Sequence, residues 1–160
     1  MNQIVKTALK YVGYPAIYYK NNSSDGVYCS SFIEQVLLEL GIEIPNIPSR
    51  DEKIKYSEQL FDFFGISVQK KFIKPGDFVF FSRNGFRPTH VGIYIGDGKM
   101  VHSPGVNGRK VEIRSIEDYI KERPLEFDPE EGYEQIYEEN PIGFKRPAII
   151  TGDRYQELLI

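Results

Sequence analysis

The sequence has one cysteine, two histidines and no tryptophan among its 160 residues. A single cysteine excludes an internal disulfide, so packing alone must hold the fold together. No stretch reaches the roughly 20 consecutive apolar residues that cross a bilayer, and we therefore expect no membrane insertion. The formal net charge of −3 gives no excess of lysine and arginine for phosphate contacts, which argues against a nucleic-acid partner.

The length and the composition fit one globular domain. Hydrophobic residues make up 41% of the chain and include 11 tyrosines and 11 phenylalanines, which is ample material for a core. We predict a single domain over residues 1–160, in which approximately residues 120–160 form an acidic C-terminal extension and the last strand. Residues 126–140 carry acidic but no basic side chains, a pattern typical of a solvated surface and less often of a docking site for a basic partner.

Apolar residues in the N-terminal half recur at helical spacing. The pattern predicts a first helix close to the N-terminus, in which Lys6 and Lys10 interrupt the apolar run and argue against a signal peptide. A second helix runs from Cys29 to Leu40, and a third opens at a capping box formed by Ser49 and Glu52. The sequence leaves the localisation unknown, either cytoplasmic or exported by a route that it does not encode.

The spacing of apolar residues changes from helical to extended after the turn at Pro75 and Gly76. Four stretches then read as strands joined in an antiparallel meander, namely FVFFS, THVGIYIG, KMVHS and KVEIR. Helices followed by strands indicate an α+β domain, with N-terminal helices packed on one face of a central antiparallel sheet of about five to six strands. The sequence does not indicate the oligomeric state.

The two histidines fall in two neighbouring strands of this meander. If residues 96–98 form a three-residue hairpin loop, Ile95 pairs with Lys99 and Gly92 faces His102. His90 and His102 then point to the same face as diagonal neighbours, roughly 7 to 8 Å apart at the backbone. A two-residue loop would place them on opposite faces.

The thiol of Cys29 has three interpretations. A lone cysteine is most often a small buried hydrophobe. Zinc held by Cys29, His90 and His102 is a second option, but the ligand spacing is not a common one, and we predict no metal or other cofactor. The third is a nucleophile, because a thiol in the first turn of a helix lies at the positive end of the helix dipole. A nearby imidazolium lowers the pKa of such thiols to about 3.5 to 7.5.

The nucleophile interpretation gives each residue a role. Cys29 attacks, His90 accepts the proton as general base, and His102 fixes the orientation of the His90 ring. Backbone amides at the start of the same helix would donate to the oxyanion. Gly92 would leave room beside the two rings because it has no side chain.

The sequence resembles the NlpC family of bacterial cell-wall cysteine peptidases, in the papain-like superfamily. The resemblance is carried by GYPAIYY, YCSSF, PGDFVFF, THVGIYIGDGKMVHS and, more weakly, GFKRP near the C-terminus. It implies that Cys29 matches the nucleophile, His90 the base and His102 the third member of a Cys-His-His triad. It also implies a papain-like fold, and cleavage of the amide between D-γ-glutamate and a diamino acid in peptidoglycan stem peptides.

The substrate is expected to be a peptide or a peptidoglycan fragment. We assign four residues around the triad to substrate binding, namely Tyr18, Tyr28, Ser30 and Thr89. Tyr28 and Ser31 stand where the family usually has Asp and Gly, and Ala16 and Tyr18 stand where it has Tyr and Trp. The alternatives are a related papain-like amidase, an acyltransferase, or a catalytically silent module that binds peptide or glycan.

Overall fold

A computed structural model describes residues 2–18, 25–42, 56–85, 87–126, 139–151 and 154–157. The helices are α1 (Gln3–Lys10), α2 (Cys29–Glu39), α3 (Tyr56–Phe63), the 3-10 helix η1 (Lys70–Phe72) and α4 (Ile116–Glu122). The strands are β1 (Ile66–Val68), β2 (Phe78–Phe81), β3 (His90–Gly96), β4 (Lys99–His102), β5 (Glu112–Ser115), β6 (Gly143–Arg146), β7 (Ala148–Thr151) and β8 (Arg154–Glu157). The expected capping box at Ser49 and Glu52, and most of the acidic segment, lie outside the described residues.

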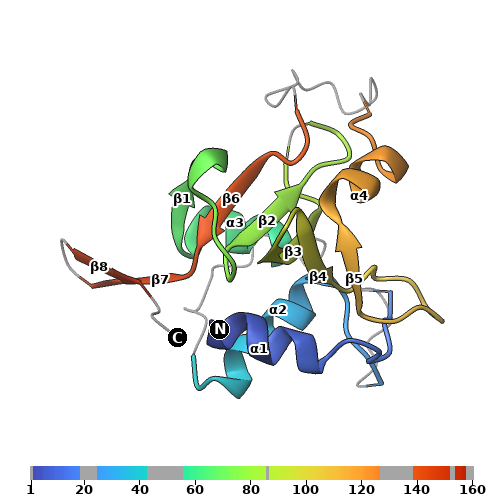
Figure 1. The fold of residues 1–160 in the computed structure, drawn as a ribbon, viewed down its shortest axis with the longest axis horizontal. Helices are drawn as coiled ribbons and strands as arrows, with labels where there is room; N and C mark the ends of the chain where they lie inside the picture. The colour runs from blue at the N-terminus through green and yellow to red at the C-terminus, as the bar shows by residue number, and fades with distance from the viewer. Residues whose placement is uncertain are drawn as a thin grey trace.

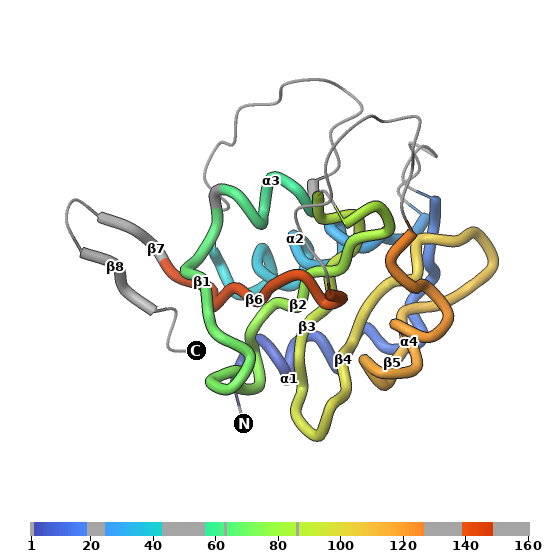
Figure 2. Tube along the Cα trace, turned by 90° about the horizontal axis from the view of Figure 1, so that it is seen from above, coloured from blue at the N-terminus to red at the C-terminus, as the bar shows by residue number. Residues whose placement is uncertain are grey.

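Six of the strands form one antiparallel sheet in the order β1-β6-β2-β3-β4-β5. Figure 2 shows this order across the molecule, with the meander β2 to β5 on one side of β6. The strands β7 and β8 pair only with each other and form a hairpin at the opposite end from α4 (Figure 1). The α+β class and the central sheet are therefore confirmed.

The N-terminal helices cover one face of the sheet, as the sequence predicts. Helix α2 presents Phe32, Ile33, Val36 and Leu37, all fully buried, because apolar residues three and four positions apart share one side of a helix. These side chains share a core with Phe78 and with the alternate residues of β2, β3 and β4 that point toward α2. Helices α1 and α3 contribute further residues to the same core. This core fixes α2, and with it the first-turn Cys29, against the sheet.

A fourth helix, which the sequence analysis missed, covers the opposite face. Helix α4 places Ile116, Tyr119 and Ile120 against the second core, formed by the other alternate residues of the strands. Those strand residues are Val79, Phe81, Met100 and Phe144. Figure 1 shows α4 beside β5. The helices of this fold therefore lie on both faces of the sheet and not on one.

A buried ion pair ties the turn before β2 to β6. Asp77 is 1% exposed, and its two carboxylate oxygens each accept a hydrogen bond of 3.0 Å from Arg146. The Lys74 amide donates to the same carboxylate at 2.9 Å, and Arg146 also donates to the Phe72 carbonyl at 3.0 Å. This bidentate ion pair holds β6 in register beside β2.

Replacing Arg146 with methionine is expected to destabilise the protein by about 3 kcal/mol, because it leaves the buried Asp77 carboxylate without its counter-ion. Urea unfolding followed by circular dichroism measures the change. The double variant Asp77→Asn/Arg146→Met removes both charges and should be less destabilised than Arg146→Met alone. Equal stability of Arg146→Met and wild type would contradict the importance of this pair.

Candidate active site

The turn of the β3–β4 hairpin differs from the predicted one, but His90 and His102 still lie on the same face of the sheet. Gly96 pairs with Lys99, so the loop is the two-residue turn of Asp97 and Gly98, with φ angles of 53° and 71°. A bulge at Ile95 adds one residue to β3, and beyond it Ile93 pairs with Val101. The predicted pairing of Ile95 with Lys99 is therefore wrong, whereas the register at the histidines is the predicted one.

The two imidazoles form a buried hydrogen-bonded pair on the α4 face of the sheet. His90 Nε2 lies 2.7 Å from His102 Nδ1, and the ring planes are nearly perpendicular at 87°. Exposure of the two residues is 8% and 1%. Gly92 leaves the space for this pair, since a Cβ there would lie 3.3 Å from His102 Cβ and 2.7 Å from the Met100 sulfur. The prediction that both rings share a face is confirmed.

Sequence reasoning missed a carboxylate on the far side of His102. Strand β5 pairs His102 with Glu112, and His102 Nε2 lies 3.1 Å from Glu112 Oε1. The same oxygen accepts a hydrogen bond of 2.9 Å from Arg109. The strand KVEIR was predicted, but the Gly- and Pro-containing loop before it does not set a register. The sequence therefore gave no signal that Glu112 lies opposite His102.

Tyr119 of α4 covers both histidines and was also missed. Its ring stacks on His90 with centroids 4.8 Å apart and an angle of 21°, and meets His102 edge-on at 5.4 Å. The Tyr119 ring also contacts the ring of Phe81, with centroids 4.6 Å apart. Aromatic contacts of this kind restrict the rotation of the rings they touch. Tyr119 thus fixes the plane of His90 from the side opposite the sheet.

Burial determines the protonation of both histidines. Desolvation, followed by the charges of His102 and Arg123, lowers the pKa of His90 well below its ordinary value of 6.5. Desolvation and the charges of Arg114 and Arg109 lower the pKa of His102 to about 3. The environment therefore favours neutral rings near pH 7, whereas the nucleophile interpretation of the sequence predicts an imidazolium beside Cys29. A neutral His90 has the free lone pair that a general base needs.

Cys29 is the first residue of α2, as predicted, and is half-buried. The helix begins after Tyr28, whose backbone is extended and whose N–H donates to Ser31 Oγ at 2.8 Å. This is one half of a capping box, and it gives Ser31 a structural role at the position where the family usually has Gly.

The Cys29 thiol interacts electrostatically with Tyr119, the ring that stacks on His90. Burial raises the pKa of Tyr119, and the negative charge of a Cys29 thiolate is the next largest cause. Cys29 is therefore within electrostatic reach of the ring that stacks on His90. Helix α2 also packs against β3, the strand that begins with His90.

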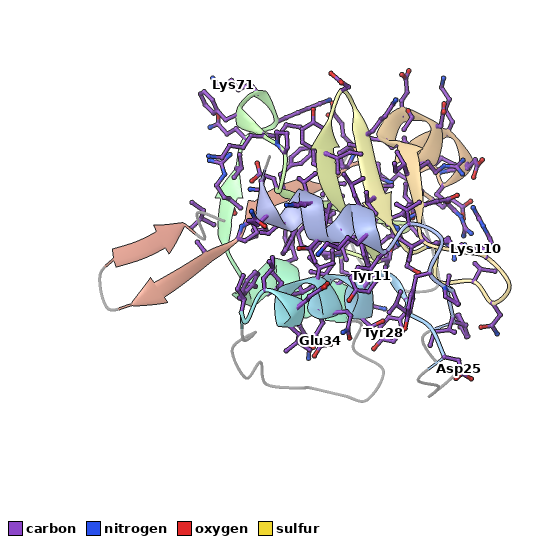
Figure 3. The ribbon with its side chains drawn as sticks, turned by 60° about the horizontal axis from the view of Figure 1, so that its bottom comes forward. Tyr11, Asp25, Tyr28, Glu34, Lys71 and Lys110 are labelled. Atoms are coloured by element: carbon purple, nitrogen blue, oxygen red, sulfur yellow. The ribbon has the colours of Figure 1, made fainter. Side chains whose placement is uncertain are left out.

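The four expected substrate-binding residues have different surroundings. Tyr18 is 41% exposed, and its N–H donates to Asn107 Oδ1 at 2.9 Å. Tyr28 lies at the same end of the molecule as Asp25 and Lys110, away from Lys71 (Figure 3). Ser30 is 3% exposed, so its hydroxyl is closed to solvent. Thr89 Oγ1 accepts from the Arg83 amide at 3.0 Å and so supports the loop before His90.

The buried neutral histidines predict a stability that depends on pH. Both folded pKa values lie below the unfolded value of 6.5, so the unfolded chain binds more protons in this range. The unfolding free energy should therefore fall as the pH drops below about 6.5, by up to about 1.4 kcal/mol per pH unit for each histidine. Urea unfolding between pH 5 and 7 measures the slope. The double variant His90→Gln/His102→Gln should flatten it, and an unchanged slope would contradict this origin.

Within the described ranges, no three His, Cys, Asp or Glu side chains are grouped so as to hold a metal ion. None of the helices that the structure describes is long and apolar enough to span a membrane.

Comparison with known proteins agrees with this geometry. The family model described as the NlpC/P60 family matches residues 17–127, which contain α2, the β3–β4 hairpin and α4. The chain belongs to the NlpC/P60 family. This is the papain-like cysteine peptidase family that acts on bacterial cell walls, so the resemblance seen in the sequence is confirmed.

Relatives of known activity share about a third of their residues with the chain over the aligned region. A gamma-D-glutamyl-L-lysine dipeptidyl-peptidase of Bacillus cereus is 32% identical over 125 residues, which cover 76% of this chain and 34% of the relative. The murein DD-endopeptidase MepS/murein LD-carboxypeptidase of Escherichia coli is 32% identical over 118 residues, or 71% of this chain and 56% of that protein. The chain thus spans only about a third to a little over half of these relatives.

A crystal structure shows the same fold. An NlpC/P60 family protein from Bacillus cereus superposes with a TM-score of 0.61 at 28% identity, and the match covers 91% of this chain and 39% of that one. The N-terminal helices and the six-strand antiparallel sheet are therefore those of the NlpC/P60 fold.

Proposed function

We propose that this chain is a cysteine hydrolase that cleaves an amide bond in peptidoglycan stem peptides, of the γ-D-glutamyl-diamino acid type. The observation that carries the proposal is the buried His90–His102 pair, joined at 2.7 Å, beside the helix that begins with the only cysteine. Membership of the cell-wall peptidase family and the similarity to a gamma-D-glutamyl-L-lysine dipeptidyl-peptidase support the substrate class.

In the first half of the reaction, His90 accepts the proton of the Cys29 thiol, and the sulfur attacks the carbonyl carbon of the amide. The negative charge on the carbonyl oxygen develops near the start of α2, where the first amides of a helix point outward and the dipole is positive. His102 holds the ring of His90 through the bond to Nε2. The neutral resting state of His90 suits it to the role of base.

In the second half, the His90 imidazolium gives its proton to the leaving amine, and the C–N bond breaks to leave a thioester on Cys29. A water molecule then loses a proton to His90 and attacks the thioester carbonyl. The thioester C–S bond breaks, the thiolate regains a proton from His90, and the carboxylic acid product leaves. No oxidant, metal or cofactor is needed to balance these steps.

Tyr28 stands directly before Cys29, where the family usually has Asp. We therefore expect the chain to recognise its peptide differently from family members that have this Asp. The resemblance assigns to that Asp the binding of a free amino terminus in enzymes that take short stem peptides. Tyr28 is half-buried and carries no charge, so it offers no counter-ion to an ammonium group. We therefore propose that the chain does not require a free amino terminus next to the D-γ-glutamyl residue.

The test incubates the purified chain with a panel of stem peptides, each prepared with a free and with an acylated amino terminus, and identifies the products by mass spectrometry. The proposal predicts cleavage after D-γ-glutamate in both forms and none by Cys29→Ala. Tight binding of the peptides with no cleavage would overturn it in favour of a binding module. Cleavage of the free-amine peptides alone would overturn the proposed role of Tyr28.

A further inference from the structure

A chain of hydrogen bonds runs from the molecular surface to the buried base. Arg109, whose side chain is 43% exposed, donates to Glu112 Oε1 at 2.9 Å. Glu112 Oε1 lies 3.1 Å from His102 Nε2, and His102 Nδ1 lies 2.7 Å from His90 Nε2. Arg114 is a further cation near the same carboxylate, at 3.8 Å, and pairs with Glu122 of α4.

The chemistry of these groups fixes where each proton lies. A carboxylate paired with arginine only accepts hydrogen bonds, so the hydrogen between Glu112 and His102 belongs to His102 Nε2. A neutral imidazole carries one N–H, so His102 Nδ1 is an acceptor and the hydrogen between the rings belongs to His90 Nε2. His90 Nδ1 is then left without a hydrogen and holds the lone pair of the base.

We propose that Glu112 is a positioning residue, which sets the tautomers of both rings so that His90 presents an unprotonated Nδ1 to Cys29. The inference rests on the proposed function and adds a fourth residue to the triad that the sequence indicates. In the reaction, the proton of the Cys29 thiol goes to His90 Nδ1 and later to the leaving amine. Throughout, His90 Nε2–H donates to His102 and His102 Nε2–H donates to Glu112, which acts only as an acceptor.

If the Glu112 carboxylate is removed, the opposite pair of histidine tautomers becomes possible. His102 can then carry its hydrogen on Nδ1 and donate it to His90 Nε2, which moves the hydrogen of His90 to Nδ1. In that tautomer, Nδ1 has no lone pair to accept the thiol proton. A wrong tautomer of the base lowers the rate of catalysis even where the positions of the groups are kept.

The experiment reads the tautomers by nitrogen NMR of protein labelled with ¹⁵N-histidine, in which only His90 and His102 contribute ring signals. Wild type should show both rings protonated at Nε2 and bare at Nδ1. Glu112→Met and Glu112→Leu remove the acceptor and should populate the Nδ1–H tautomer of His90. Glu112→Gln keeps one acceptor oxygen and should retain the wild-type tautomers. The control Glu117→Leu changes a carboxylate on α4 that is 82% exposed and should alter nothing.

Kinetics with a cleaved stem peptide complete the test. The loss of a hydrogen bond to a charged group should lower kcat roughly 10- to 100-fold in Glu112→Met, with KM within about twofold, while Glu112→Gln stays within a few-fold of wild type. The inference is overturned if wild-type His90 is protonated at Nδ1, if Glu112→Met keeps wild-type tautomers and rate, or if Glu112→Gln falls as far as Glu112→Met. If the tautomers respond as expected but no peptide is cleaved, the hydrolase proposal fails and the positioning by Glu112 stands.

Discussion

Replacing Cys29 with alanine is expected to reduce peptide hydrolysis at least about a thousandfold, because no other nucleophile can form the thioester. The protein should stay folded, with a change in unfolding free energy of about 1 kcal/mol or less. A half-buried cysteine at a helix start contributes little core volume compared with the fully buried Phe32 and Ile33 on the same helix. Peptide hydrolysis followed by mass spectrometry, together with urea unfolding, measures both quantities.

Ser67→Ala is the control for this substitution, since it changes an exposed side chain of similar size on the edge strand β1, away from β3 and β4. Its hydrolysis rate should stay within about tenfold of wild type. Activity of Cys29→Ala comparable to that of Ser67→Ala would show that the thiol is not the nucleophile.

Replacing His90 with glutamine is expected to lower kcat/KM by about 10²- to 10⁴-fold, the usual contribution of a general base. Glutamine can keep a hydrogen bond to His102 but cannot accept the thiol proton. In the wild type, the pKa of His90 is held well below 6.5 by burial and nearby positive charge, so the ring stays unprotonated as the pH falls to that value. The acid limb of kcat/KM should therefore lie below pH 6.5 and vanish in His90→Gln.

The profile of kcat/KM between pH 4.5 and 8 measures this limb. His102→Gln provides the comparison, because it alters the orientation of His90 and leaves the base itself in place. It should retain more activity than His90→Gln. An acid limb at or above pH 6.5 in wild type, or equal losses in the two variants, would contradict the assignment of roles.

The elements that carry the proposed triad could be predicted because each depends on local sequence. The spacing of apolar residues after Cys29 defines α2, and the alternation around Gly96–Gly98 defines the hairpin. The turn was predicted with the wrong length. The same-face arrangement of His90 and His102 nevertheless holds, because the bulge at Ile95 compensates for the missing loop residue.

The residues that surround the histidine pair could not be predicted, because their positions depend on contacts between distant segments. Glu112 meets His102 only through the pairing of β4 with β5, and the intervening loop leaves that register open. Tyr119 lies in a seven-residue helix that follows a strand directly, and three apolar residues are too few to identify a helix from periodicity. Burial of both rings, which favours their neutral form, is likewise a property of the assembled layers.

Activation of the Cys29 thiol by His90 can be measured as the rate of alkylation by iodoacetamide at pH 7. The chain has one cysteine, so the label reports on Cys29 alone and the result does not depend on the choice of peptide. Wild type should be alkylated at least about tenfold faster than folded His90→Gln, because only the imidazole accepts the thiol proton. Equal rates in the two proteins would show that His90 does not act on Cys29 and would contradict the proposed mechanism.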